Sequence, residues 1–84
     1  MQKVIVYTAR PCGYCSAAKS LLSQLDIAFE ELDLTGDATA RQALIGQTGQ
    51  RTVPQIFVGE VHVGGFTELR ALHSAGKLIP LVQS

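Results

Sequence analysis

The sequence predicts an α/β fold in which one mixed four-stranded sheet is flanked by helices. Short apolar runs alternate with segments whose apolar residues recur every three or four positions, which indicates strands alternating with helices. Two runs rich in β-branched and aromatic residues, 55–58 and 61–63, are separated only by Gly59-Glu60, and this connection favours a β-hairpin. We therefore expect the order β-α-β-α-β-β-α. A length of 84 residues predicts one domain, residues 1–84.

The first strand and the first helix are predicted from residues 4–25. Residues 4–8 are β-branched or aromatic throughout, as expected for a central strand buried on both faces. Pro11 ends this strand because proline has no backbone N–H to donate. From residue 12 to residue 25 the apolar positions keep helical spacing, and the expected inward residues are Cys15, Ala18, Leu22 and Leu25.

A second strand and a second helix follow. Apolar and polar residues partly alternate toward the end of residues 27–34, which predicts a strand with one polar face. Residues 35–37 are typical of a turn followed by a helix N-cap. The second helix is expected over residues 38–47, with Ala40, Ala43 and Leu44 facing inward. A right-handed crossover would make the first two strands parallel.

The C-terminal third contains the hairpin and the last helical segments. The hairpin adds an antiparallel pair of strands to the sheet. A third helix is expected over residues 67–75, after Gly64-Gly65 and before Gly76. Residues 78–82 are an apolar tail that we expect to cover the core as a short helical turn.

The two cysteines, Cys12 and Cys15, lie at the expected start of the first helix. This position brings their thiols to one face, within reach of a disulfide. The unpaired amides of the helix would favour the thiolate of Cys12, which makes it the expected nucleophile. Cys15, one turn inside, would resolve the mixed disulfide. The pattern therefore predicts thiol–disulfide exchange.

Two alternatives exist for the cysteine pair. A zinc site would need two more ligands, and the spacing of His62 and His73 fits no zinc motif, so no metal site is predicted from the residues. A plain structural disulfide in a small binding domain is the other alternative.

Composition excludes several classes of partner. Lys+Arg and Asp+Glu are both 7, so bulk charge indicates neither a nucleic-acid nor a membrane-surface partner. The apolar runs are far shorter than the roughly 18 residues of a membrane span. The N-terminus has no signal-peptide pattern, so we expect a cytoplasmic location, where a cysteine pair favours redox activity over a structural role.

Three motifs together resemble the glutaredoxins. They are Val6-Tyr7-Thr8 leading to Cys12-Gly13-Tyr14-Cys15, Gly49-Gln50-Arg51-Thr52-Val53-Pro54-Gln55-Ile56-Phe57-Val58-Gly59, and Gly64-Gly65-Phe66-Thr67-Glu68-Leu69. The resemblance implies a thioredoxin fold and a monomer that uses glutathione to reduce protein disulfides and glutathione mixed disulfides. Glutathione reductase would then recycle the oxidised glutathione.

The resemblance also implies a set of glutathione-binding residues. Val53, before a cis Pro54, would pair with the cysteinyl part of glutathione, with Thr52 beside it. The backbone of Gly65 and the amides of the next helix start would hold the γ-glutamyl carboxylate, and the Glu68 carboxylate would take the ammonium. The remaining implied contacts are the amides of Phe66 and Thr67, the Tyr14 ring, and the cations Arg41, Arg51 and Arg10. Arg10 is included because Ala9 stands where many relatives have lysine.

A second activity follows from Gly13, which replaces the proline of the commonest family motif. In some relatives without that proline, two subunits bridge a [2Fe–2S] cluster through their first cysteines and two glutathiones. Cys12 would then be the iron ligand and the chain would form a dimer.

Overall fold

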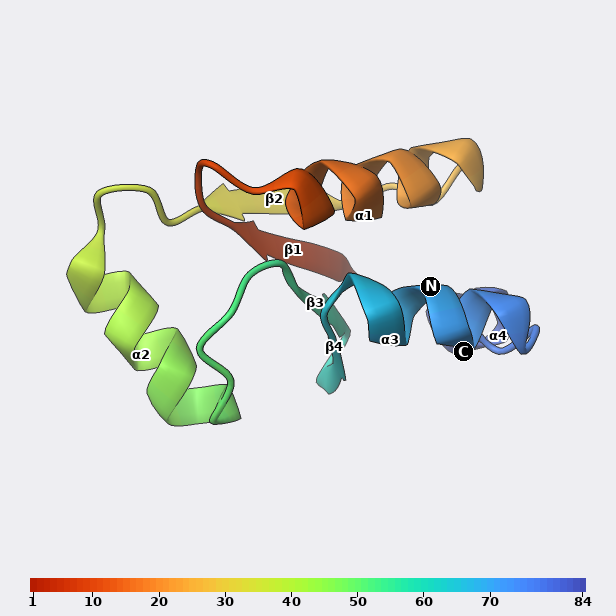
Figure 1. Cartoon of the computed structure of the whole chain (residues 1–84). Helices are drawn as coiled ribbons and strands as arrows, with labels where there is room; N and C mark the ends of the chain where they lie inside the picture. Colours follow the sequence, from red (N-terminus) through yellow and green to blue (C-terminus); the bar gives the residue numbers. More distant parts are fainter.

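The structure, a computed structural model, describes all residues from 1 to 84 and has the predicted order of elements (Figure 1). The elements are β1 (Val4–Thr8), α1 (Gly13–Gln24), β2 (Glu30–Asp33), α2 (Ala38–Thr48), β3 (Gln55–Val58), β4 (Val61–Gly64), α3 (Phe66–Ser74) and α4 (Leu78–Gln83). The apolar tail is thus a helix of its own. None of the helices is long and apolar enough to cross a membrane.

The four strands form one mixed sheet in the order β2-β1-β3-β4, which confirms the predicted fold. β1 runs parallel to β2 and antiparallel to β3, and β3 runs antiparallel to β4. Tyr7 near the end of β1 pairs with Gln55 at the start of β3. The loop that follows β1 and the loop that precedes β3 therefore lie side by side at the same end of these two central strands.

The larger core lies between the sheet and the helices α1, α3 and α4. Val6 of β1, Leu22 of α1 and Leu69 of α3 are each 0% exposed. Burial of such side chains stabilises the fold by about 1.5–3 kcal/mol each. This packing fixes α1 and α3 against the sheet, and with them the two helix starts that matter for the site.

A smaller cluster covers the opposite face of the sheet, where α2 lies (Figure 1). It consists of Leu34, Leu44 and Phe57, with Tyr7 and Ala40 packed against it. Ala43, predicted to face inward, is exposed. The prediction was wrong because Leu44 is the one buried residue of α2, so the helix contacts the sheet along a narrow stripe.

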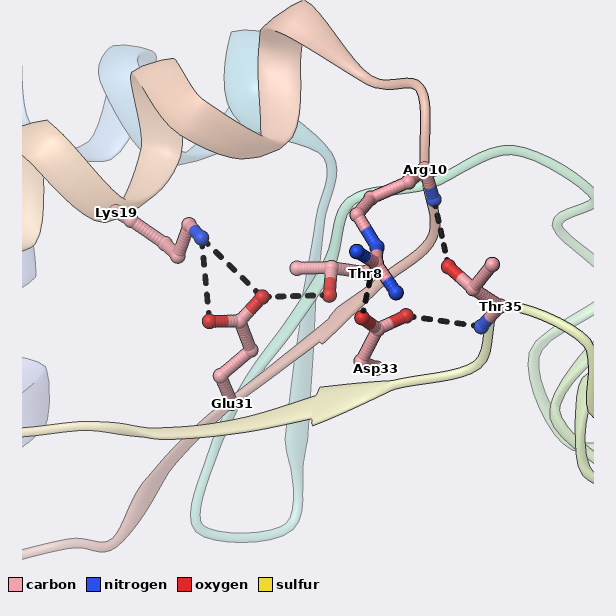
Figure 2. Close-up of polar contacts among 6 residues, drawn as sticks. All are labelled: Thr8, Arg10, Lys19, Glu31, Asp33 and Thr35. Carbon is pink, nitrogen blue, oxygen red and sulfur yellow. Dashed lines mark hydrogen bonds and ion pairs between the residues drawn. The ribbon is translucent and has the colours of Figure 1, made fainter.

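The strand β2 is shorter than the predicted 27–34 and all four of its residues are exposed. It is an edge strand, and each of its acidic residues forms an ion pair with a cation from a neighbouring segment (Figure 2 shows two of them). The pairs are Lys3–Glu30 at 3.5 Å, Lys19–Glu31 at 3.1 Å and Arg10–Asp33 at 3.3 Å. Charges along an edge strand oppose pairing with another chain.

The ion pairs on β2 predict how stability depends on pH. The hydroxyl of Thr8, 2.8 Å away, and then the ammonium of Lys19 hold the pKa of Glu31 below its usual value. Because the pKa is lower in the folded state, the stabilisation is present above the unfolded pKa and is lost as pH falls through the folded one. Between about pH 7 and about pH 3, the unfolding free energy of Glu31→Gln should therefore fall less than that of the wild type, by about 1 kcal/mol or less.

Urea unfolding at the two pH values measures this difference, with Glu60→Gln as the matched control because Glu60 is exposed and lies in the turn between β3 and β4. The same pH slope in wild type and Glu31→Gln would contradict the prediction.

Candidate active site

The two cysteines lie at the N-terminus of α1 and form a disulfide with a Cα–Cα distance of 5.3 Å. Cys12 is the N-cap residue, and its Sγ accepts the backbone N–H of Cys15 at 3.0 Å. Cys15 is 4% exposed, because its side chain points into the molecule, whereas Cys12 is only half-buried. An amide donor and a helix N-terminus both stabilise negative charge on the Cys12 sulfur.

The loop before β3 faces this sulfur. The Sγ of Cys12 lies 3.6 Å from the carbonyl oxygen of Val53. The Val53–Pro54 peptide bond is cis, as the family resemblance implied, and the Arg10–Pro11 bond, which the sequence analysis left unassigned, is cis as well. The backbone of Val53 thus borders the redox-active pair, although 41 residues separate Cys12 from Val53.

A groove of about 390 Å³ lies between this loop and the start of α3. Its lining residues are Tyr14, Gln50, Thr52, Val53, Pro54, Gly65, Phe66, Thr67 and Glu68. The structure therefore brings eight of the residues implied by the resemblance to one place. Gln50 was missed by the sequence analysis. Its position in the motif with Thr52 and Val53 was the available signal.

The start of α3 supplies one wall of the groove. Gly65 is the N-cap residue and its N–H donates to Oε1 of Glu68 at 2.7 Å. The amides of Phe66, Thr67 and Glu68 belong to the first turn, where no carbonyl four residues earlier lies inside the helix. Free amides at a helix start form a site for a negatively charged group.

An aromatic pair closes the groove on the side of α1. The ring of Tyr14 stacks on the ring of Phe66, with centroids 6.1 Å apart and planes at 26°. Tyr14 is nevertheless 67% exposed, so most of its ring remains available for contact with a ligand or a protein. The pair joins the start of α1 to the start of α3.

The three predicted arginines lie outside the groove. Arg10 pairs with Asp33, and its backbone N–H donates to the hydroxyl of Thr35 at 2.8 Å (Figure 2). Arg10 and Arg41 both line a separate hollow of about 310 Å³ beside Ala9. Arg41 Nη2 donates to the carbonyl oxygen of Arg51 at 3.4 Å, next to the groove residue Thr52.

A disulfide at a helix N-terminus, facing the backbone that precedes a cis-proline and a β-hairpin, defines a class of protein. The order of the strands and the helices on both faces give the same class. The chain is a thiol–disulfide oxidoreductase with the thioredoxin fold.

The comparisons with known proteins identify the family. The family model described as "Glutaredoxin" matches residues 4–63. Glutaredoxin 3 of Escherichia coli K12 is 43% identical over 83 residues, which cover 99% of this chain and all of that protein. A glutaredoxin of Pseudomonas aeruginosa PAO1 is 43% identical over the full length of both chains. The chain belongs to the glutaredoxin family.

Solved structures agree with this assignment. The structure of a buckwheat glutaredoxin–glutathione complex has a TM-score of 0.88 and 35% identity, covering 98% of this chain and 77% of that one. The solution structure of a glutaredoxin from Brucella melitensis has a TM-score of 0.87 and 43% identity, covering 98% and 89% of the two chains.

Proposed function

We propose that the chain uses glutathione to reduce protein disulfides and glutathione mixed disulfides in the reducing cytoplasm. The observation that carries this proposal is the groove beside Cys12, which has free backbone amides at one end and the Val53 backbone at the other. A similar chain, the buckwheat glutaredoxin, has been solved as a complex with glutathione.

Each part of the tripeptide has a chemically matched partner in this groove or next to it. The cysteinyl part would lie along Val53, which places its sulfur next to Cys12. The γ-glutamyl carboxylate would accept hydrogen bonds from the amides at the start of α3, and the Glu68 carboxylate would hold the ammonium. Arg41 and Arg51, which lie beyond Thr52, would attract the glycyl carboxylate, together with Arg10, which lines the same hollow as Arg41.

Reduction of a glutathione mixed disulfide needs only Cys12. Its thiolate attacks the glutathione sulfur, and the protein thiolate leaves and takes a proton. A second glutathione thiolate then attacks the glutathione sulfur held by Cys12. This step releases oxidised glutathione and regenerates the Cys12 thiolate. Each turnover consumes one free glutathione, which leaves joined to the glutathione that came from the substrate.

Reduction of a protein disulfide would use both cysteines. Cys12 attacks one sulfur of the substrate and forms a mixed disulfide. Cys15 then attacks the sulfur of Cys12, releases the reduced protein and leaves the Cys12–Cys15 disulfide, which is the state of the structure. Two glutathiones return the pair to dithiol, and glutathione reductase recycles the oxidised glutathione.

Glu68→Gln tests the proposed contact with glutathione. Glutamine still accepts the N–H of Gly65, so the start of α3 is retained, but the negative charge that would hold the ammonium is lost. The KM for a glutathionylated peptide should rise about fivefold with little change in kcat, because an exposed charge pair contributes about 1 kcal/mol. The coupled assay with glutathione and glutathione reductase measures both constants.

The control is Glu60→Gln, which removes an equal charge from the turn between β3 and β4 and should leave the KM unchanged. NMR spectra of the Cys15→Ser protein joined to glutathione at Cys12 should show shifted amides at Val53, Phe66 and Thr67. A wild-type KM retained in Glu68→Gln, together with unshifted amides, would refute glutathione binding in this groove.

A glutathione-ligated [2Fe–2S] cluster is the second proposed activity. Cys12 is the more accessible sulfur, and no group of three or more His, Cys, Asp or Glu side chains in the chain could hold a metal. The terminal ligands of the two irons would be the Cys12 thiolates of two chains and the thiolates of two glutathiones, and the bridging sulfides would complete each tetrahedron. Anaerobic reconstitution should then give a brown dimer that Cys12→Ser abolishes, and a colourless monomer would refute this activity.

A further inference from the structure

Gln55 is a buried polar residue whose hydrogen bonds go to the groove loop. It is the first residue of β3, directly after Pro54, and is 1% exposed. Its Nε2 donates to the carbonyl oxygen of Gln50 at 2.7 Å and to that of Thr52 at 3.1 Å. Its Oε1 is buried and has no hydrogen-bond partner. One side chain in the sheet thus bonds two carbonyls of residues 50–54.

These two bonds orient the loop. Gln55 holds the backbone carbonyls of Gln50 and Thr52 on the side of the sheet. The side chains of Gln50 and Thr52 line the groove. There the Nε2 of Gln50 donates to the hydroxyl of Thr52 at 3.1 Å. Val53 follows directly and presents its carbonyl to the sulfur of Cys12. Gln55 itself does not line the groove.

Packing alone does not account for a glutamine at this position. A buried amide oxygen without a partner lowers stability, because it has lost its hydration and gained no bond in return. An apolar side chain of similar length would avoid that loss. What an apolar side chain would not supply is the pair of donors to the loop.

We propose that Gln55 is a positioning residue that fixes residues 50–54 in the conformation that binds glutathione, and so sets the affinity of the groove. This inference rests on the proposed glutathione binding. It adds a residue that acts from inside the sheet, through the backbone carbonyls of two groove residues, without touching the ligand.

Gln55→Met is the main test, because methionine has a similar length and no donor. The KM for a glutathionylated peptide should rise roughly tenfold, as expected for two lost hydrogen bonds, while kcat changes less than about twofold. Backbone ¹⁵N order parameters of Thr52 and Val53, measured without glutathione, should fall from about 0.85 toward about 0.6. The melting temperature should change little, because removal of the unpartnered Oε1 offsets the loss of the two bonds.

Gln55→Glu provides a second, isosteric variant. Burial beside two carbonyl oxygens raises the pKa of the new carboxyl group. Above that pKa the carboxylate cannot donate, and the KM should rise at least as much as in Gln55→Met. Below the pKa of the new carboxyl group one donor is restored, and the KM relative to wild type should improve. A side chain that only filled space would not produce this pH dependence.

Val58→Ala is the matched control. Val58 is a buried residue of the same strand, 1% exposed, and it lies far along β3 from the loop. Its truncation should lower the melting temperature but leave the KM and the order parameters unchanged. An equal KM increase in Val58→Ala, or unchanged order parameters in Gln55→Met, would overturn the role of Gln55. Failure of the wild type to bind glutathione would overturn the proposed function and with it the effect of Gln55 on affinity. The order parameters would then decide separately whether Gln55 holds residues 50–54 in place.

Discussion

Cys12→Ser should lower the rate of thiol–disulfide exchange by at least about a thousandfold, the scale on which loss of an enzyme's nucleophile acts. The new serine hydroxyl at the N-cap can still accept the backbone N–H of Cys15, so α1 and the groove should be preserved. The hydroxyl cannot form a disulfide, and it does not ionise near neutral pH. The coupled glutathione assay measures the loss.

Cys15→Ser is the matched variant, because it removes the other sulfur of the same pair. Reduction of a glutathione mixed disulfide should keep a measurable part of its rate, since that route needs only Cys12 and glutathione. Reduction of protein disulfides should lose more, because the mixed disulfide with the substrate then lacks its resolving thiol. Equal losses in the two variants, or full activity in Cys12→Ser, would contradict the assignment of Cys12 as the nucleophile.

The parts of the fold and site that local chemistry determines could be predicted from the sequence. The β-branched and aromatic residues 4–8, the helical spacing after Cys12 and the Gly59-Glu60 turn each indicate one element. The antiparallel pairing of β1 with β3 then brings distant motifs together. The redox-active pair could be predicted from the spacing of Cys12 and Cys15 at the start of a helix alone.

What the sequence did not predict depends on long-range partners. The direction of the Arg10 side chain is set by Asp33, which is its neighbour only because β1 pairs with β2. The burial of Gln55 follows from its place under the loop before β3, and nothing in residues 50–55 alone shows which side chain would turn inward. Ala43 has the spacing of a core residue, but the narrow contact of α2 leaves it exposed.

Gly64, the last residue of β4, should be the most sensitive position next to the groove outside the cysteine pair. Gly64 has a φ of +116°, a conformation that side chains with a Cβ rarely adopt. A Cβ added there would lie 2.9 Å from Oε1 and 3.0 Å from Cγ of Glu68, so the Glu68 side chain would have to move. That movement would break the bond that caps α3 through the N–H of Gly65.

Gly64→Ala should therefore lower the free energy of unfolding by about 2–4 kcal/mol, the sum of backbone strain and a lost cap. It should also raise the KM for glutathionylated peptide, because Glu68 and the free amides of α3 are displaced together. Urea unfolding and the coupled assay measure the two effects. Gly46→Ala is the control: a Cβ there has open space inside α2, and stability should rise by about 0.5–1 kcal/mol.

A double-mutant cycle shows whether the effect of Gly64→Ala arises through Glu68. In the Glu68→Ala background the side chain that clashes and the cap are already absent, so only the backbone strain at position 64 remains to be added. The two substitutions should then cost less together than the sum of their separate effects. Strict additivity would show that Gly64→Ala does not act through Glu68. A wild-type unfolding free energy in Gly64→Ala would show that the start of α3 does not depend on a glycine before Gly65.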